Sequence, residues 1–371
     1  MYFSRNNNIL LSSILSTFFM GQSARAQEGT GNMVKMCLFY PNPSGHARTD
    51  PIITQTCASD HVHSFYGPQN FHPDTTYNDL LDTPPSKSSS PWVENQSLYW
   101  HPSIYRITDE DDGSETYERI SNLETSPYYR WDNSVSPATV EFPPEFRMIA
   151  YSNDEGADAG GEVGENLFVE CCNFIGNDNE ECTSSSGTIE FPRKNCSFLG
   201  IAMAMPTCWN GGLGINNNHK DHMAYTDDGT VHGDCPSGYN KRLPQIQLFV
   251  RVNNYQGAKY RYTLSDASTN WHVDFMNGWK QGKLNNIIKN CPITGNGNEG
   301  YNPPCNCDQF LTENPNPSKA VCDKDVRSLI LDEATDTFKQ LPRTTCNGDI
   351  IPKSWDVDPP LTCNGGGGGG G

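Results

Sequence analysis

Short runs of apolar residues that alternate with polar ones recur along this chain, and they predict strands rather than helices. In residues 246–252 the apolar side chains mostly occupy every second position, as in a strand with one buried face. The 33 Gly and 26 Pro residues of the chain are typical of strands joined by long loops. We also predict strands at residues 139–142, 146–151, 198–204 and 260–264.

Helical periodicity is scarce, and only residues 279–290 and 326–338 carry it. We find no internal repeat. The expected fold class is therefore mainly β, a single large sandwich or jelly-roll-like domain with long loops, few short helices and disulfide bonds. The main domain should span residues 36–291, followed by a Cys-rich extension at 292–363 and a poly-Gly tail at 364–371.

The first 26 residues have the pattern of a secretory signal peptide. Arg5 precedes an apolar run at residues 9–20, and Ala24-Arg25-Ala26 is a small-x-small cleavage signal. An uncleaved N-terminal anchor is the alternative. No later stretch approaches the roughly 20 apolar residues of a membrane helix, so we expect a secreted, extracellular protein with no membrane span after cleavage.

All fourteen cysteines follow the predicted signal peptide, which is an even number in an exported chain. This favours a disulfide framework over a thiol enzyme, with the connectivity left open. Zinc ligation is the alternative for the vicinal pair Cys171-Cys172 and for Cys305 and Cys307, although structural zinc motifs prefer two to four residues between cysteines.

Charge excludes partners better than it identifies them. Loss of residues 1–26 removes Arg5 and Arg25 but no acidic residue, so the formal net charge changes from −18 to −20. Such a surface repels nucleic acid and anionic membranes, and we see no basic patch that argues for either partner. Acidic stretches at 109–118 and 154–165 predict exposed loops, and Asn95 and Asn195 begin candidate glycan-acceptor sequons.

Histidines gather in short clusters, and imidazole is both the commonest protein metal ligand and a general base near neutral pH. In a strand, His61 and His63 would share one face and could present two imidazoles to a metal. His219 and His222 follow a Gly- and Asn-rich segment that predicts a loop, which can also supply ligands. We therefore take these four histidines as candidate ligands of a divalent metal ion.

His272 and Asp274 again share a strand face, and a carboxylate beside an imidazole can fix its tautomer. We take this pair as the candidate catalytic base. For every cluster, the alternative is a histidine that hydrogen-bonds within polar structure and binds nothing. Glycoside hydrolysis would need two carboxylates, and acidic residues are too abundant for the sequence to select a pair.

The clusters belong to an ordered series of segments between residues 50 and 291. The series comprises Asp50-Pro51-Ile52, His61-Val62-His63-Ser64-Phe65-Tyr66-Gly67, Ser97-Leu98-Tyr99-Trp100-His101-Pro102, Phe142-Pro143-Pro144-Glu145-Phe146-Arg147, Pro206-Thr207-Cys208-Trp209-Asn210-Gly211, His219-Lys220-Asp221-His222-Met223-Ala224-Tyr225, Gly233-Asp234-Cys235-Pro236 and His272-Val273-Asp274-Phe275-Met276-Asn277-Gly278-Trp279. In residues and in order, it resembles the secreted fungal and bacterial family known as domain of unknown function nineteen ninety-six. The resemblance implies an extracellular protein, in some members joined to carbohydrate-binding modules, and hence a role at polysaccharide or cell-wall surfaces. It implies no reaction.

Three function classes follow. The first is a secreted, His-dependent, metal-binding enzyme that acts on polysaccharide or glycoconjugate, because a bound metal ion can polarise a scissile group or lower the pKa of water. The second is a noncatalytic cell-wall or matrix protein that binds glycans through exposed Trp and Tyr and whose histidines are scattered. The third is an adhesive protein that binds calcium through its acidic surface. Convergence of the histidines in one pocket would favour the enzyme.

Overall fold

The computed structural model describes residues 33–55, 59–69, 71–152, 166–175, 179–187, 189–215, 219–292, 307–317 and 337–341. The predicted signal peptide, the acidic stretch 154–165 and the poly-Gly tail lie outside the described residues. Within the described part, neither helix has the length and apolarity needed to cross a bilayer.

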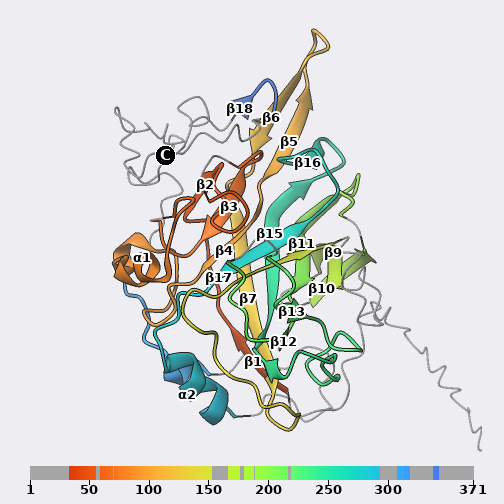
Figure 1. The fold of residues 1–371 in the computed structure, drawn as a ribbon. Coiled ribbons are helices and arrows are strands. Elements are labelled where there is room, and N and C mark those ends of the chain that lie inside the picture. The colour runs from red at the N-terminus through yellow and green to blue at the C-terminus, as the bar shows by residue number, and fades with distance from the viewer. Residues whose placement is uncertain are drawn as a thin grey trace, which may run out of the picture.

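Two antiparallel sheets form the body of the protein (Figure 1). In spatial order, the six-stranded sheet consists of β1 (Met33–Cys37), β7 (Leu123–Asp132), β15 (Gln245–Gln256), β11 (Asn195–Ala204), β9 (Leu167–Ile175) and β10 (Asn179–Ser186). The five-stranded sheet consists of β2 (Gly45–Ala47), β3 (His63–Tyr66), β4 (Leu98–Pro102), β17 (His272–Met276) and β8 (Arg147–Tyr151).

Smaller elements surround these sheets. A four-stranded sheet consists of β16 (Arg261–Leu264), β5 (Ile104–Asp109), β6 (Glu115–Arg119) and β18 (Thr337–Phe338), and a three-stranded sheet of β13 (Met223–Ala224), β12 (Cys208–Trp209) and β14 (Lys241–Arg242). The described helices are α1 (Tyr77–Asp82), α2 (Lys283–Asn290) and the short 3-10 turns η1 (Pro85–Lys87) and η3 (Asp308–Phe310).

The larger of the two hydrophobic clusters in the described residues, the central core, lies between the two large sheets. Tyr129 and Val250 from the six-stranded sheet are buried in the same cluster as Tyr99 and Phe275 from the five-stranded sheet. Along β15, every second residue from Ile246 to Val252 is buried in this cluster, as the alternation in the sequence predicts. The predicted mainly β, sandwich-like fold is therefore confirmed.

A buried hydrogen-bond network joins the two sheets across this core. The hydroxyls of Tyr99 on β4 and Tyr129 on β7 lie 2.5 Å apart, and the Trp279 indole N–H donates to Tyr129 at 3.0 Å. The Asn95 amide donates to the Tyr99 hydroxyl at 3.0 Å. Because each of these buried polar groups has a partner, the network fixes β4 against the opposite sheet without an unpaired group.

Most predicted elements match the observed ones, and the differences have local causes. Residues 139–142 do not form a strand: Thr139 makes one isolated bridge, and Pro143 and Pro144, which lack backbone donors, follow. The helix predicted at 279–290 begins only at Lys283, because Gly282 before it has a left-handed φ of 82°. Of the helix predicted at 326–338, residues 326–336 lie outside the described residues, and Thr337–Phe338 is strand β18.

The vicinal cysteines are oxidised to two different partners. Cys171 pairs with Cys196 on β11, and Cys172 pairs with Cys182 on β10. Consecutive strand residues point to opposite faces, so the two disulfides lie on opposite faces of the sheet. Further bonds join Cys208 to Cys235 and Cys291 to Cys307. The expected disulfide framework is thus present.

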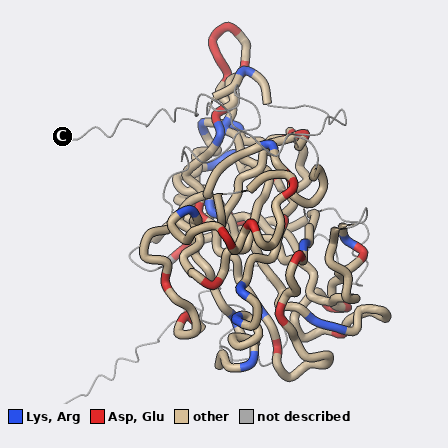
Figure 2. Tube along the Cα trace, turned by 60° about the vertical axis from the view of Figure 1, so that its left-hand side comes forward, with Lys and Arg blue, Asp and Glu red and all other residues tan. Residues whose placement is uncertain are grey.

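The described part of residues 292–363 packs against the main body. Cys307 is buried in the central core, and the Thr312 backbone amide and hydroxyl both donate to the Glu94 carboxylate, at 2.9 and 2.7 Å. Phe338 on β18 pairs with Tyr117 on β6. The acidic stretch 109–118 is the β5–β6 hairpin, whose tip carries a run of acidic residues at the top of Figure 2.

Gly67, directly after β3, requires the absence of a side chain for two reasons. Its φ is 114°, and an added Cβ would lie 2.2 Å from the Ser97 carbonyl oxygen. We expect Gly67→Ala to lower the free energy of unfolding by about 3 kcal/mol, measured by urea unfolding of the oxidised protein. Gly113→Ala is the control, because Gly113 has a similar φ of 81° but open space around it. It should cost only about 1 kcal/mol, and equal losses in both variants would contradict the steric argument.

Candidate metal centre

The candidate site lies on the face of the five-stranded sheet that points away from the central core. Val273 and Phe275 of β17 are buried in the central core, so the alternate residues His272 and Asp274 point to the other face. His63 on β3 pairs with Pro102 of β4, the strand between β3 and β17. Two strand spacings separate β3 from β17 by about 10 Å, which two imidazoles extended toward each other can bridge.

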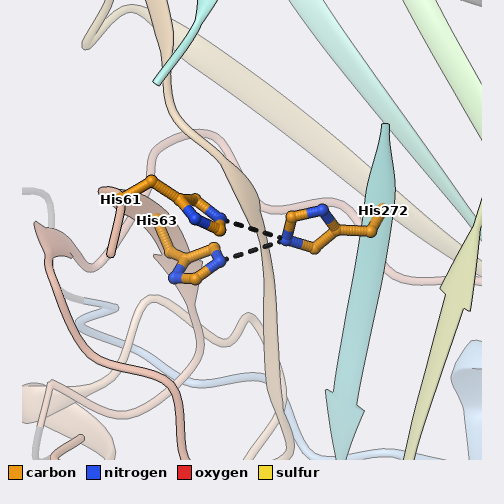
Figure 3. A group of neighbouring side chains, drawn as sticks. All are labelled: His61, His63 and His272. Carbon is orange, nitrogen blue, oxygen red and sulfur yellow. Dashed lines mark hydrogen bonds between the residues drawn. The ribbon is translucent and has the colours of Figure 1, made fainter. Parts of the chain in front are cut away.

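Three imidazoles converge on this face, and we call His61, His63 and His272 the imidazole triad (Figure 3). The Nε2 atom of His272 lies 3.1 Å from Nε2 of His63 and 3.4 Å from Nε2 of His61. Two nitrogens about 2.0 to 2.1 Å from one zinc ion at a tetrahedral angle are about 3.3 Å apart. The spacing of the triad therefore fits three ligands of one metal ion.

The other ring nitrogen of each triad imidazole has an acceptor. Nδ1 of His61 contacts the Asp60 carboxylate at 2.6 Å, and Nδ1 of His63 contacts the Thr49 carbonyl oxygen at 2.9 Å. His272 hydrogen-bonds the backbone of Asn270. A carbonyl or carboxylate oxygen only accepts, so each of these bonds places a proton on the ring nitrogen that faces the acceptor, and in a neutral ring Nε2 then keeps its lone pair.

Burial keeps two of these rings neutral. It lowers the pKa of His63 and of His272 well below 6.5, and the neighbouring imidazoles lower both further. The Nε2 lone pairs of His63 and His272 thus face each other at 3.1 Å, with Nε2 of His61 beside them. A cation among them removes this repulsion, and neutral imidazole is the form that binds metals.

Asp274 lies beside the triad, on the side where the three Nε2 atoms converge. Its Oδ2 is 3.8 Å from Nε2 of His272, the nitrogen that faces the other imidazoles, and not from Nδ1. The residue is 1% exposed, and neither carboxylate oxygen has a hydrogen-bond partner among the described residues. Burial raises the pKa of Asp274 well above its usual value, and the nearby Asp50 raises it further. Asp274 therefore does not fix the His272 tautomer; the backbone of Asn270 does.

His219 and His222 are held by the backbone, not by the triad. Nε2 of His222 lies 2.7 Å from the Arg147 carbonyl oxygen, and its ring packs against Phe146. Nδ1 of His219 lies 3.0 Å from the Gly214 carbonyl oxygen. Among the described residues, neither belongs to the convergent group. The structure thus brings together two of the four proposed ligands, His61 and His63, and adds His272, which we expected to act as a base.

The segment that contains His219 and His222 nevertheless borders the site. The Lys220 ammonium lies 4.2 Å from the centre of the Tyr151 ring, and that ring lies 5.4 Å from the His272 ring. His219 is also close enough to Asp50 to lower its pKa, although burial outweighs this and raises the pKa of Asp50 overall. This segment therefore contributes to the surroundings of the triad.

A second group with metal-ligand residue types consists of Glu170, Cys172 and Cys182. Its two sulfurs are already bonded to each other, so neither is a thiolate. This excludes the zinc alternative for Cys172 in the oxidised protein.

Sequence reasoning missed the residues that orient the triad. Asp60 directly precedes His61, so an acidic neighbour of the His-x-His pair was a visible signal. Thr49 and Asn270 act through their backbones, and no side-chain pattern could reveal them. Of the two candidate glycan acceptors, Asn95 is buried and bonded to Tyr99, whereas Asn195 is exposed.

Two histidine substitutions separate the triad from the backbone-held histidines. We expect His63→Ala to lower zinc affinity by about 100-fold or more, because a ligand is lost. His222→Ala should leave zinc affinity unchanged but lower the free energy of unfolding by about 1 to 3 kcal/mol, since the Arg147 carbonyl loses its donor. Competition with a chromophoric chelator and urea unfolding measure the two effects. Equal losses of affinity would place His222 in the metal site instead.

Comparison with protein families gave one match for this chain. The model of the family described as Domain of unknown function (DUF1996) matches residues 50–279, which is more than half of the chain and includes the whole imidazole triad and Asp274. The comparison with curated proteins found no match, and the comparison with solved structures found none either. The chain belongs to the DUF1996 family.

Proposed function

We propose that this protein is a secreted, metal-dependent enzyme that acts on extracellular polysaccharide or glycoconjugate. His61, His63 and His272 hold one divalent metal ion through their Nε2 atoms. The observation that carries the proposal is the convergence of three ring nitrogens at 3.1 and 3.4 Å, each ring fixed from behind by an acceptor. Such an arrangement is costly without a cation and is the usual construction of a metal site.

The ligand set indicates the kind of metal and the kind of site. Imidazole nitrogens suit zinc, copper, iron and nickel, whereas calcium and magnesium prefer oxygen ligands. Three protein ligands leave a coordination position open, as in catalytic zinc sites, while structural zinc sites have four. His61 is 12% exposed at its side chain and adjoins the exposed Asp60, so the triad has a side that faces solvent. Zinc is accordingly the metal that we test first.

Several features support an extracellular setting. The described disulfides require an oxidising compartment, and the N-terminal residues have the signal-peptide pattern. Substrates of the polysaccharide class are inferred from the family resemblance, in which some members are joined to carbohydrate-binding modules.

A noncatalytic glycan-binding role is less well supported. It needs exposed Trp or Tyr side chains, and the large hydrophobic residues exposed in the described part are Phe39, Ile53, Val140, Phe174, Ile175 and Ile215. It also expects scattered histidines, whereas three of them converge. We therefore retain the enzyme as the proposed function.

Elemental analysis of the full chain after mild purification tests the proposal. We expect near-stoichiometric zinc or another transition metal in the wild type, and its loss in the double variant His61→Ala His63→Ala. His219→Ala is the matched control and should keep the metal, because His219 lies outside the triad. A wild-type protein that binds no metal when supplied with zinc, or a double variant that keeps it, would sink the proposal.

A further inference from the structure

Metal binding by the imidazole triad gives no role to Asp274, which is buried next to it. A carboxyl group that is 1% exposed and has no described hydrogen-bond partner is costly to bury unless a ligand satisfies it, and a cation bound beside it favours its ionised form. Its Oδ2 lies 3.8 Å from His272 Nε2, yet Asp274 is not part of the group whose ligand atoms all converge. It is therefore placed to contact whatever occupies the open coordination position, rather than to complete the ligand set.

The exposure of the neighbouring residues indicates from which side a substrate reaches the open coordination position. Asp274 is fully buried beside His272, whereas His61 adjoins solvent through the exposed Asp60. A substrate reaches the metal from the His61 side, and a water molecule in the open position can donate a hydrogen bond to Asp274. Trp100 on β4 and Ile149 on β8 flank Asp274 in register, and neither side chain hydrogen-bonds its oxygens.

The lack of a described partner for Asp274, and for no second carboxyl beside it, also indicates which type of bond the site cleaves. Hydrolysis of a glycosidic bond needs two carboxyl groups on opposite sides of that bond. The other buried carboxyl near the triad is Asp50, and its Oδ1 already accepts the backbone N–H groups of Ile52 and Ile53. A Lewis acid with one general base is suited instead to a carbonyl group, whose oxygen the metal polarises.

We propose, resting on the metal centre above, that Asp274 is the catalytic base of an acyl hydrolase that removes ester- or amide-linked acyl groups from extracellular glycans. Asp274 accepts a proton from the water while the water oxygen forms a bond to the carbonyl carbon. The carbon–oxygen bond of an ester, or the carbon–nitrogen bond of an amide, then breaks with its electron pair on the leaving atom. The proton passes from Asp274 to that leaving oxygen or nitrogen, which yields a carboxylic acid and a free hydroxyl or amino group.

The test uses the zinc-loaded full chain with 4-nitrophenyl acetate, acetylated xylan oligomers and N-acetylated chitin oligomers as probes. Acetate or nitrophenol release is compared in the wild type, Asp274→Asn, Asp274→Glu and the matched control Asp82→Asn, which alters an exposed carboxylate on α1. The double variant His61→Ala His63→Ala supplies the background rate. Elemental analysis and urea unfolding of each variant show whether metal and fold are retained.

We expect Asp274→Asn to lower kcat by about 100-fold or more with unchanged KM and zinc content, because a general base contributes about that much. Asp274→Glu should restore part of the rate, and Asp82→Asn should match the wild type. Wild-type rates in Asp274→Asn, or no acyl release above background by the zinc-loaded wild type, would overturn the inference and leave the metal centre in place. Elemental analysis detects an absence of zinc from the wild type independently of the rates. That result would overturn the proposed function as well.

Discussion

The close approach of three buried or half-buried imidazole rings is the constraint around which this face of the protein is built. Each ring is fixed by an acceptor behind it, so none can turn its proton toward the others without losing a hydrogen bond. The rings nevertheless approach to 3.1 and 3.4 Å, which only the register of β3, β4 and β17 makes possible. A displacement of β3 by one residue would turn His63 to the opposite face and separate the three rings.

The same strands serve two purposes because strand residues alternate between faces. On β17, Val273 and Phe275 belong to the central core, while His272 and Asp274 belong to the candidate site. On the central strand β4, Tyr99 is hydrogen-bonded to Tyr129 of the opposite sheet, so the strand between the two halves of the triad cannot move independently. The site is therefore built on the best-supported part of the sheet, as metal sites with fixed ligand geometry require.

Sequence reasoning recovered what depends on local periodicity. The alternation in residues 246–252 predicted a strand, and the spacing of His61 and His63 predicted a shared orientation. It could not recover the partner of these two histidines, because His272 is more than 200 residues away and meets them only through the order β3-β4-β17. His219 and His222 form a pair of closely spaced histidines in the sequence, as His61 and His63 do. What distinguishes them is where their rings lie: Nε2 of His222 faces the Arg147 carbonyl, and His219 lies outside the convergent group, which depends on tertiary packing.

The disulfide between Cys291 and Cys307 has a consequence for the covalent continuity of the chain. A protease that cuts anywhere between these two cysteines would not separate the two fragments. The cleaved protein would migrate as one species on a non-reducing gel and as two on a reducing gel. Secretion into a protease-rich environment could thus convert the protein into a two-chain molecule that keeps Cys307 in its core and the Thr312 bonds to Glu94.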